Sequence, residues 1–249
     1  MKDARDVFTP ARAETYAREG AVLLPGAIPL QDIEAMATTL RRKLADRPQR
    51  TARPSKLSSR TGEFDAMASP AVRTVLDALL GDWEEPTHWG LPLVSFHTGE
   101  ALWDVPREHW HIDLGARPGD HLRLARLFAV LAPSRPGGGG TGYVAGSHRL
   151  FQALFEETGH ALPSAQARQR LEARSTWFTA LSSRQDSGER IRRFMQDGSE
   201  LDGVQVRVCE MLGEPGDVIL MHPLMLHAPT PNVLATPRMM LTQFAYGRG

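Results

Sequence analysis

From Leu91 onward, the sequence is built from short extended runs interrupted by glycine and proline. Such runs, rich in β-branched and aromatic residues and ended by turn-forming residues, are typical of β-strands. The predicted strands span 93–97, 109–114, 122–132, 142–144, 204–212, 218–221 and 239–246. Many short strands in one stretch favour a double-stranded β-helix, the jelly-roll barrel of the cupin type. We therefore expect a mainly β protein with added α elements.

The first ninety residues indicate helices instead. Thr9, Pro10 and Gly20 mark the start and end of a first helix, because threonine caps an N-terminus, proline fits the first turn and glycine follows the last. A second helix is predicted over 29–44, and a third begins at Ser69-Pro70 and ends at Gly81. We expect these helices to pack on the outside of a sheet. The polar stretch 46–60 predicts a loop.

A second helical stretch, about 150–203, interrupts the predicted strands, with helices expected over 166–181 and 188–195. One interpretation is a packing insert with a solvated basic face formed by Arg190, Arg192 and Arg193. The other is a lid over the barrel mouth, where Trp177 and Phe178 would contact substrate. With no repeat in the sequence, we expect a single domain over 1–249, with a mostly helical part at 1–90 and a β core at 91–249.

Charge and cysteine content narrow the class of protein. Lys+Arg and Asp+Glu balance at 29 each, so no net positive field favours nucleic acid or a membrane surface as partner. The single cysteine, Cys209, cannot form an internal disulfide, which fits a reducing cytoplasm. No apolar run approaches the ~20 residues of a membrane span. These features favour a cytoplasmic enzyme with a small-molecule substrate, and they leave the oligomeric state open.

The segment His111-Ile112-Asp113 supplies two candidate metal ligands. Alternate residues of a strand face the same side, so His111 and Asp113 can reach one ion while Ile112 faces away. His227 is the best third ligand. Two imidazoles and one carboxylate on one face of Fe(II) leave open positions for a co-substrate and O2.

Three other histidines compete for these roles. His109 shares the predicted strand parity of His111, but it lies four residues from the carboxylate. Pro223 follows His222 and ends regular strand pairing, which favours a packing or supporting role for His222. His148 has no carboxylate beside it and is expected to brace a turn.

The phrases around these residues resemble the phytanoyl-CoA dioxygenase family of Fe(II)/2-oxoglutarate oxygenases. They are Tyr16 to Gly26, Trp110-His111-Ile112-Asp113, Gly142 to His148, Gly216 to His222 running on to His227 and Asn232, and finally Arg238. The resemblance covers nearly the whole chain. It implies His111, Asp113 and His227 as both catalytic and metal-binding residues, with Fe(II) as cofactor and 2-oxoglutarate and O2 as co-substrates.

Arg238 is the expected anchor for 2-oxoglutarate. That co-substrate chelates iron through its 1-carboxylate and 2-keto oxygen, which leaves a distal carboxylate for a two-pronged guanidinium. Arg238 lies eleven residues after His227, a spacing that the resemblance supports. Family members often carry a small hydroxyl residue two positions after the distal histidine, where this chain has Pro229. Thr230 or Thr242 is the expected replacement in the cofactor-binding set.

The retained Asp113 bears on the reaction. Related halogenating enzymes lack this carboxylate, so hydroxylation of an unactivated C–H bond, with release of succinate and CO2, is favoured. Desaturation, cyclisation and epimerisation use the same ligands and remain open. For the substrate we expect a small organic acid, an amino-acid derivative or a secondary metabolite. Candidate contacts are Arg126, which faces either inward or an outer edge, together with Trp110 and Trp177.

Two other classes of protein have to be weighed. A non-catalytic cupin-like binding protein could use the same pocket, although it would not need Arg238. A zinc hydrolase could also use two histidines and one aspartate, but Glu108 is the only nearby candidate for a general base. Gly137 to Gly140 form a flexible connection rather than a phosphate loop, because no Lys-Ser/Thr and helix follow.

Overall fold

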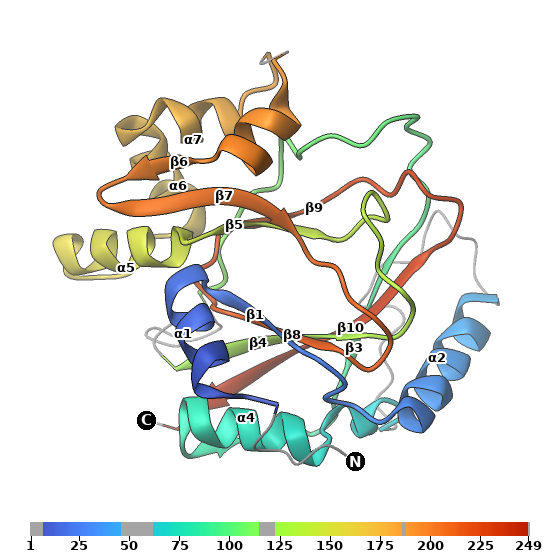
Figure 1. The fold of residues 1–249 in the computed structure, drawn as a ribbon. Coiled ribbons are helices and arrows are strands. Elements are labelled where there is room, and N and C mark those ends of the chain that lie inside the picture. Colours follow the sequence, from blue (N-terminus) through green and yellow to red (C-terminus); the bar gives the residue numbers. More distant parts are fainter. Residues whose placement is uncertain (1–6, 46–61, 115–122, 186–187, 249) are drawn as a thin grey trace.

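The computed structural model describes residues 7–45, 62–114, 123–185 and 188–248. Two antiparallel sheets face each other, and helices cover the outer face of each sheet (Figure 1). The sheets do not close into a barrel in the part of the chain that is described. This arrangement confirms the predicted jelly-roll class.

The larger sheet has six strands in the order β1-β8-β4-β10-β2, with β3 also paired to β10. Their bounds are β1 (Ala21–Leu24), β2 (Trp83–Glu84), β3 (Leu91–Ser95), β4 (Leu124–Val130), β8 (Val218–Met221) and β10 (Arg238–Gly247). Strand β10 is central, because β4 pairs with one of its edges while β2 and β3 share the other.

The smaller sheet has four strands in the order β6-β7-β5-β9. Their bounds are β5 (Thr141–Ala145), β6 (Ser199–Leu201), β7 (Val204–Glu210) and β9 (His227–Pro229). Between the two sheets lies a small apolar layer that includes Phe128 and Met240 from the larger sheet and Tyr143 from the smaller one. The space beside this layer holds the polar residues described below.

The N-terminal helices pack on the outer face of the larger sheet, as expected. They are α1 (Pro10–Glu19), α2 (Leu30–Ala45), the 3-10 turn η3 (Asp65–Met67) and α4 (Pro70–Leu80). Thr9 caps α1 by accepting a hydrogen bond from the Arg12 amide, and Gly20 ends the helix at φ 78°. Ser69 caps α4 in the same way. Their apolar sides join Leu127, Ala129 and Leu220 of the sheet in one buried cluster.

The helical insert covers the outer face of the smaller sheet. It contains α5 (Ser147–Thr158), α6 (Ser164–Arg174), α7 (Thr176–Leu181) and the π-helix η5 (Ile191–Asp197). Phe151, Phe178 and Phe194 pack with Val206 and Val208 of β7. The insert thus forms a packing layer, and a lid role stays a hypothesis. The predicted loop at 46–60 lies outside the described residues.

Several predicted elements were wrong in detail. Residues 109–114 do not form a strand: His111 makes only an isolated bridge to His227, and His109 has φ 66°. The predicted helix over 166–181 is broken at Ser175, which is extended and separates α6 from α7. Arg190 does not lie on a solvated face, because it is 2% exposed.

Four short strands were missed by the sequence prediction, namely β1, β2, β6 and β9. None has more than four residues, which is too few to show a clear periodicity. Within the described residues, no helix is long and apolar enough to cross a membrane.

Candidate metal centre

His111, Asp113 and His227 come together between the two sheets. Each offers one ligand atom, and these atoms all lie within 4.8 Å of one another. The His227 Nε2 atom is 3.7 Å from Asp113 Oδ2, and the two imidazole centroids are 4.1 Å apart. The arrangement offers two nitrogens and one oxygen to a single ion.

Backbone contacts orient both imidazoles. His111 and His227 exchange amide-to-carbonyl hydrogen bonds of 2.9 Å each, which hold their backbones side by side. The Nδ1 atom of His111 lies 2.7 Å from the carbonyl of His109, and that of His227 lies 2.9 Å from the carbonyl of Met225. Because a carbonyl only accepts, Nδ1 carries the proton in each ring and Nε2 keeps its lone pair for a metal.

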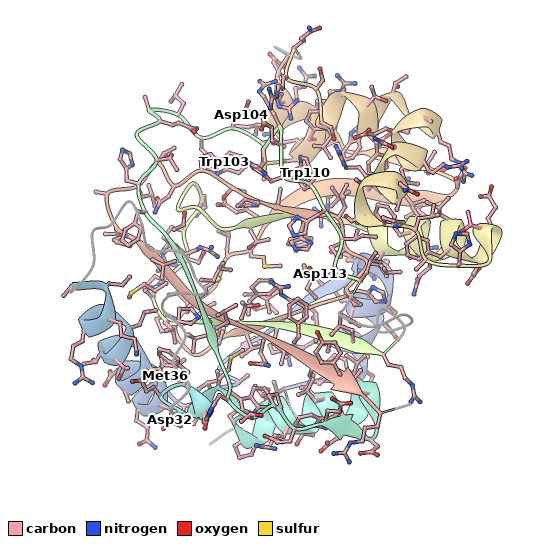
Figure 2. The ribbon with its side chains drawn as sticks, turned by 180° about the vertical axis from the view of Figure 1, so that it is seen from behind. Asp32, Met36, Trp103, Asp104, Trp110 and Asp113 are labelled. Carbon is pink, nitrogen blue, oxygen red and sulfur yellow. The ribbon has the colours of Figure 1, made fainter. Side chains whose placement is uncertain are left out.

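The ligand segment is held without being part of a regular strand. The Ile112 amide donates to Ser164 Oγ at 2.9 Å, and the Asp113 amide donates to the carbonyl of Pro223 at 2.8 Å. Ser164 is the first residue of α6, so the insert contributes directly to the support of this segment. The side chain of Ile112 is buried in the cluster outside the smaller sheet. Figure 2 shows Trp103, Asp104 and Trp110 on the segment that leads to Asp113.

Burial keeps His227 neutral. Loss of solvent lowers the pKa of His227 to about 4, although the nearby Asp113 carboxylate acts in the opposite direction. A neutral imidazole is the form that binds metal, so this ring is ready to act as a ligand at neutral pH.

Arg126 of β4 lies between the sheets, beside the triad, rather than at an outward edge. Its Nη1 donates to Asp113 Oδ2 at 2.9 Å, and its Nε donates to Thr242 Oγ1 at 3.0 Å. Its guanidinium carbon is 3.9 Å from the ring centroid of Phe244. Burial lowers the pKa of Arg126, and the negative charge of Asp113 offsets only part of this lowering.

Arg238 is a buried cation at the start of β10. Its Nη1 contacts the sulfur of Met240 at 3.1 Å, and its Nε has no hydrogen-bond partner among the described residues. Burial lowers the pKa of Arg238 to about 10, and the charge of Glu210 counteracts this effect. A guanidinium in these surroundings is suited to an incoming anion, because a buried charge needs a partner.

Glu210 was not singled out from the sequence, where it is one acidic residue at the end of a strand. Its carboxylate accepts hydrogen bonds from the amides of Gly137 and Gly140, and Thr230 Oγ1 lies 3.3 Å from its Oε1 atom. Burial raises its pKa. The glycine run therefore has a structural function, since its amides hold the carboxylate that faces Arg238.

The two threonines have different positions. Thr242 lies on the same face of β10 as Arg238, and its hydroxyl donates to the Leu127 carbonyl while accepting from Arg126. Thr230 donates to the Gly140 carbonyl at 2.8 Å. Their roles toward a co-substrate stay predictions.

The competing histidines lie outside the triad in the described structure. His109 offers its carbonyl to His111. The ring of His222 lies 4.9 Å from that of His148 and 6.1 Å from that of Tyr16, measured between centroids. His148 Nε2 contacts the Ala17 carbonyl at 3.1 Å, which ties the start of α5 to α1.

The two predicted tryptophan contacts are both buried. Trp110 donates from Nε1 to the Pro106 carbonyl at 2.9 Å. Trp177 packs edge-on against Phe178 and Phe194, with centroid distances of 5.0 and 5.1 Å. Both belong to the apolar cluster beneath the insert. Their predicted contact with substrate has no support from these positions.

Comparison with known proteins identifies the fold. The epimerase SnoN, in a structure with Fe3+, alpha ketoglutarate and nogalamycin RO, superposes with a TM-score of 0.55 at 16% identity over 95% of this chain and 82% of SnoN. HygX from Streptomyces hygroscopicus, with nickel and 2-oxoglutarate bound, superposes with a TM-score of 0.55 at 16% identity over 96% of this chain and 87% of HygX. The nickel complex of the non-heme monooxygenase ThoJ superposes with a TM-score of 0.54 at 16% identity over 94% of this chain and 76% of ThoJ.

At these identities the likeness establishes the jelly-roll fold that such enzymes share. No protein-family model and no curated protein matches the chain. Membership of the phytanoyl-CoA dioxygenase family therefore stays a prediction.

Proposed function

We propose that this protein is a non-haem Fe(II)- and 2-oxoglutarate-dependent dioxygenase that hydroxylates a small organic molecule. The observation that carries the proposal is the position of two features between the same sheets: the cluster of His111, Asp113 and His227, and the buried cation Arg238. The similarity of the fold to SnoN, HygX and ThoJ supports it.

The donor set fits an open iron site. Two neutral imidazoles and a carboxylate are the ligands of mononuclear iron oxygenases, and three protein ligands leave positions for other molecules. Iron held here, together with 2-oxoglutarate and O2, would supply the oxidising power to break a C–H bond, with succinate and CO2 as by-products. The chain's own contribution is to present the two Nε2 atoms and the carboxylate, and to restrict access of water by burial of His227.

The surroundings of Arg238 fit the distal carboxylate of 2-oxoglutarate. The Arg238 side chain is 5% exposed. Among the described residues, its guanidinium makes one hydrogen-bond contact, to the sulfur of Met240. Glu210 acts on this guanidinium by its charge without a hydrogen bond, and a carboxylate bound here would supply hydrogen-bonding oxygen atoms. Thr242 and Thr230 are proposed as secondary contacts of the co-substrate.

Hydroxylation is proposed over halogenation because Asp113 fills the position that a halide would need. Desaturation, cyclisation and epimerisation are alternatives with the same cofactors, and SnoN, with the same fold, is described as an epimerase. The product therefore has to be identified chemically.

A zinc hydrolase fits the structure less well. Glu108, the candidate general base, is exposed and pairs with Arg184. No role in hydrolysis would explain the buried Arg238. A non-catalytic cupin-like protein would likewise leave that cation without a function.

The test is turnover of the co-substrate. Protein purified without oxygen and loaded with Fe(II) should convert 2-oxoglutarate to succinate on exposure to air, and addition of a true substrate should raise the rate and yield a product heavier by one oxygen. Protein loaded with Zn(II) is the control. Failure to release succinate with iron bound would contradict the proposal, and a product lighter by two hydrogens would favour desaturation or cyclisation.

A further inference from the structure

Arg126 contacts the triad directly and still has hydrogen-bond donors to offer. Its Nη1 donates to Asp113 Oδ2 and its Nε donates to Thr242 Oγ1, while its Nη2 makes no hydrogen bond with the described residues. The side chain is 14% exposed, so part of it is open to solvent. Nη1 carries two hydrogen atoms, and together with Nη2 it can donate two parallel hydrogen bonds to a carboxylate.

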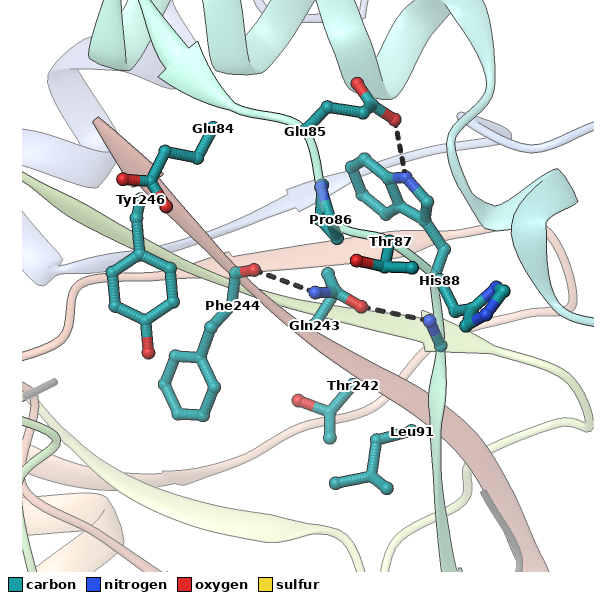
Figure 3. Close-up of a pocket in the computed structure, with 12 residues that line it drawn as sticks. Glu84, Glu85, Pro86, Thr87, His88, Leu91, Thr242, Gln243, Phe244 and Tyr246 are labelled. Carbon is teal, nitrogen blue, oxygen red and sulfur yellow. Dashed lines mark hydrogen bonds between the residues drawn. The ribbon is translucent and has the colours of Figure 1, made fainter. Parts of the chain in front are cut away.

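Aromatic rings hold this guanidinium in place. The ring centroid of Phe244 lies 3.9 Å from the guanidinium carbon, and that of Phe128 lies 5.2 Å from it. Thr242 and Phe244, which both contact Arg126, lie on the same side of β10 (Figure 3). Phe244 is only half-buried, so part of its ring remains available to an apolar group. A side chain fixed in this way loses little entropy when it binds a ligand.

Exposure differs among the residues around the triad. His111 is exposed, and the side chains of Asp113 and Arg126 are 13% and 14% exposed. His227 and Arg238 are more deeply buried, at 4% and 5%. A substrate that arrives from solvent therefore meets His111, Asp113 and Arg126 before it meets the deeper groups.

The two arginines between the sheets occupy separate positions along β10. Arg126 pairs with Phe244, which is six residues from Arg238, or about 20 Å along a strand. The side chains lean toward each other, because Arg126 bonds to Thr242 and Arg238 contacts Met240. If the proposed function holds, the distal carboxylate of 2-oxoglutarate pairs with Arg238. Arg126 then stays available to a different molecule.

A metal ion in the triad would leave Arg126 without a full charge partner. Asp113 is the carboxylate that Arg126 contacts among the described residues. The same Oδ2 atom lies 3.7 Å from His227 Nε2, so a divalent ion would share it. The 1-carboxylate of 2-oxoglutarate would be matched by that ion. Arg126 would then need an additional anion, because a largely buried charge is costly without a partner.

We propose that Arg126 binds a carboxylate of the primary substrate, which is therefore a small organic acid with an apolar part. The carboxylate accepts hydrogen bonds from Nη1 and Nη2, and the apolar part packs beside Phe244. This proposal rests on the proposed function and narrows the expected range of substrates to acids. Arg126 is thus a residue that determines specificity, and its orientation is fixed by Thr242 and Phe244.

Two probes of nearly the same shape test the need for a carboxylate: phenylacetate and its neutral amide, phenylacetamide. Each is titrated with protein loaded with Mn(II) and saturating 2-oxoglutarate, and the line broadening that Mn(II) causes in the proton NMR spectrum reports binding near the triad. Protein loaded with Zn(II) is the diamagnetic control. We expect phenylacetate to bind at least about tenfold more tightly, as hydrogen bonds between charged groups in a largely buried site predict.

Variants show whether Arg126 causes this preference. Arg126→Gln should weaken phenylacetate binding at least about tenfold and leave phenylacetamide unchanged, while Arg126→Lys, which keeps the charge, should retain part of the preference. The matched control is Arg73→Gln, which should change neither. Arg73 also combines an ion pair, with Glu85, and aromatic contacts, but it lies on α4 outside the larger sheet. Thermal unfolding checks that each variant is folded.

The affinity for 2-oxoglutarate separates two possible sources of the carboxylate. Measured by calorimetry on metal-loaded protein, this affinity should change by less than about threefold in Arg126→Gln, the size of a weak charge effect. A loss of about tenfold or more would show that Arg126 holds the 1-carboxylate of 2-oxoglutarate instead. That result would overturn the proposal.

The remaining outcomes are equally decisive. Equal affinity of the two probes for the parent protein, or the absence of broadening for both, would overturn the proposal, and neither measurement depends on a variant that folds. A preference for phenylacetate that persists in Arg126→Gln would overturn it as well. If the parent protein loaded with Mn(II) does not bind 2-oxoglutarate, the proposed function itself fails.

Discussion

The Arg126 guanidinium and the Asp113 carboxylate form an ion pair, with Nη1 2.9 Å from Oδ2, and both side chains are largely buried. The same Oδ2 atom is the one that lies 3.7 Å from His227 Nε2. Arg126 therefore competes with a metal ion for the oxygen that faces the triad. The pair also fixes the carboxylate between β4 and the ligand segment.

The first prediction concerns this competition. Arg126→Gln removes a positive charge next to the metal centre, so we expect Co(II) to bind at least about tenfold more tightly in the absence of 2-oxoglutarate, equivalent to about 1.4 kcal/mol. Calorimetric titration under nitrogen measures the affinity. Arg135→Gln, at an exposed ion pair with Glu214, is the control and should have no effect. Weaker Co(II) binding in Arg126→Gln would mean that Arg126 orients Asp113 for the metal instead.

The second prediction concerns the three ligands. His111→Ala, Asp113→Ala and His227→Ala should each abolish metal binding and turnover while far-UV circular dichroism stays unchanged, because the sheets pack through apolar layers on both sides. Metal content after dialysis is the direct measurement. His222→Ala is the matched control, since its ring packs against His148 outside the triad. Loss of iron in His222→Ala but not in His227→Ala would contradict the assigned distal ligand.

The third prediction concerns Arg238. Removal of one partner of a buried charge pair costs roughly 3–5 kcal/mol, so Arg238→Ala should weaken 2-oxoglutarate binding by about two to three orders of magnitude. Metal affinity should barely change. A shorter 2-oxo acid without the distal carboxylate should bind equally to both proteins, and it serves as the internal control. Near-normal affinity of the variant for 2-oxoglutarate would identify another cation as the anchor, with Arg126 the first candidate.

The fourth prediction concerns the pH dependence of stability. Burial lowers the pKa of His148 to about 4, below the usual histidine value of about 6.5. The folded state thus favours the neutral ring, while the unfolded chain takes up a proton below pH 6.5. This contribution to stability is present above that pH and is lost as the pH falls from 6.5 toward 4, by roughly 1–3 kcal/mol.

His148→Asn should reduce the stability that the protein loses as the pH falls. The free energy of unfolding, measured with urea at pH 7.5 and pH 5, should differ less between the two pH values in the variant than in the parent protein. His222→Asn, which changes the neighbouring ring, controls for altered packing. Equal pH dependence in His148→Asn and the parent would contradict a neutral, buried His148.

The helix ends and the main strands could be predicted from the sequence because their causes are local. Thr9 caps the helix that begins at Pro10 by accepting a hydrogen bond from an amide three residues further on, and Gly20 ends the same helix through its own backbone conformation. The candidate ligands His111, Asp113 and His227 were also indicated by the sequence, through their order and surrounding phrases, and the structure brings them together. Local pattern and residue chemistry were sufficient for these features.

Only the tertiary structure determined how those residues meet. His111 and Asp113 reach one point through a bridge to β9 and a hydrogen bond to Pro223, not through the parity of a strand. The partners of Arg126 lie 13 and 116 residues away, and the carboxylate that faces Arg238 belongs to a different sheet. Such contacts depend on how two sheets pack face to face. A one-dimensional pattern carries no information on that packing, because residues distant in sequence become neighbours only when the sheets have formed.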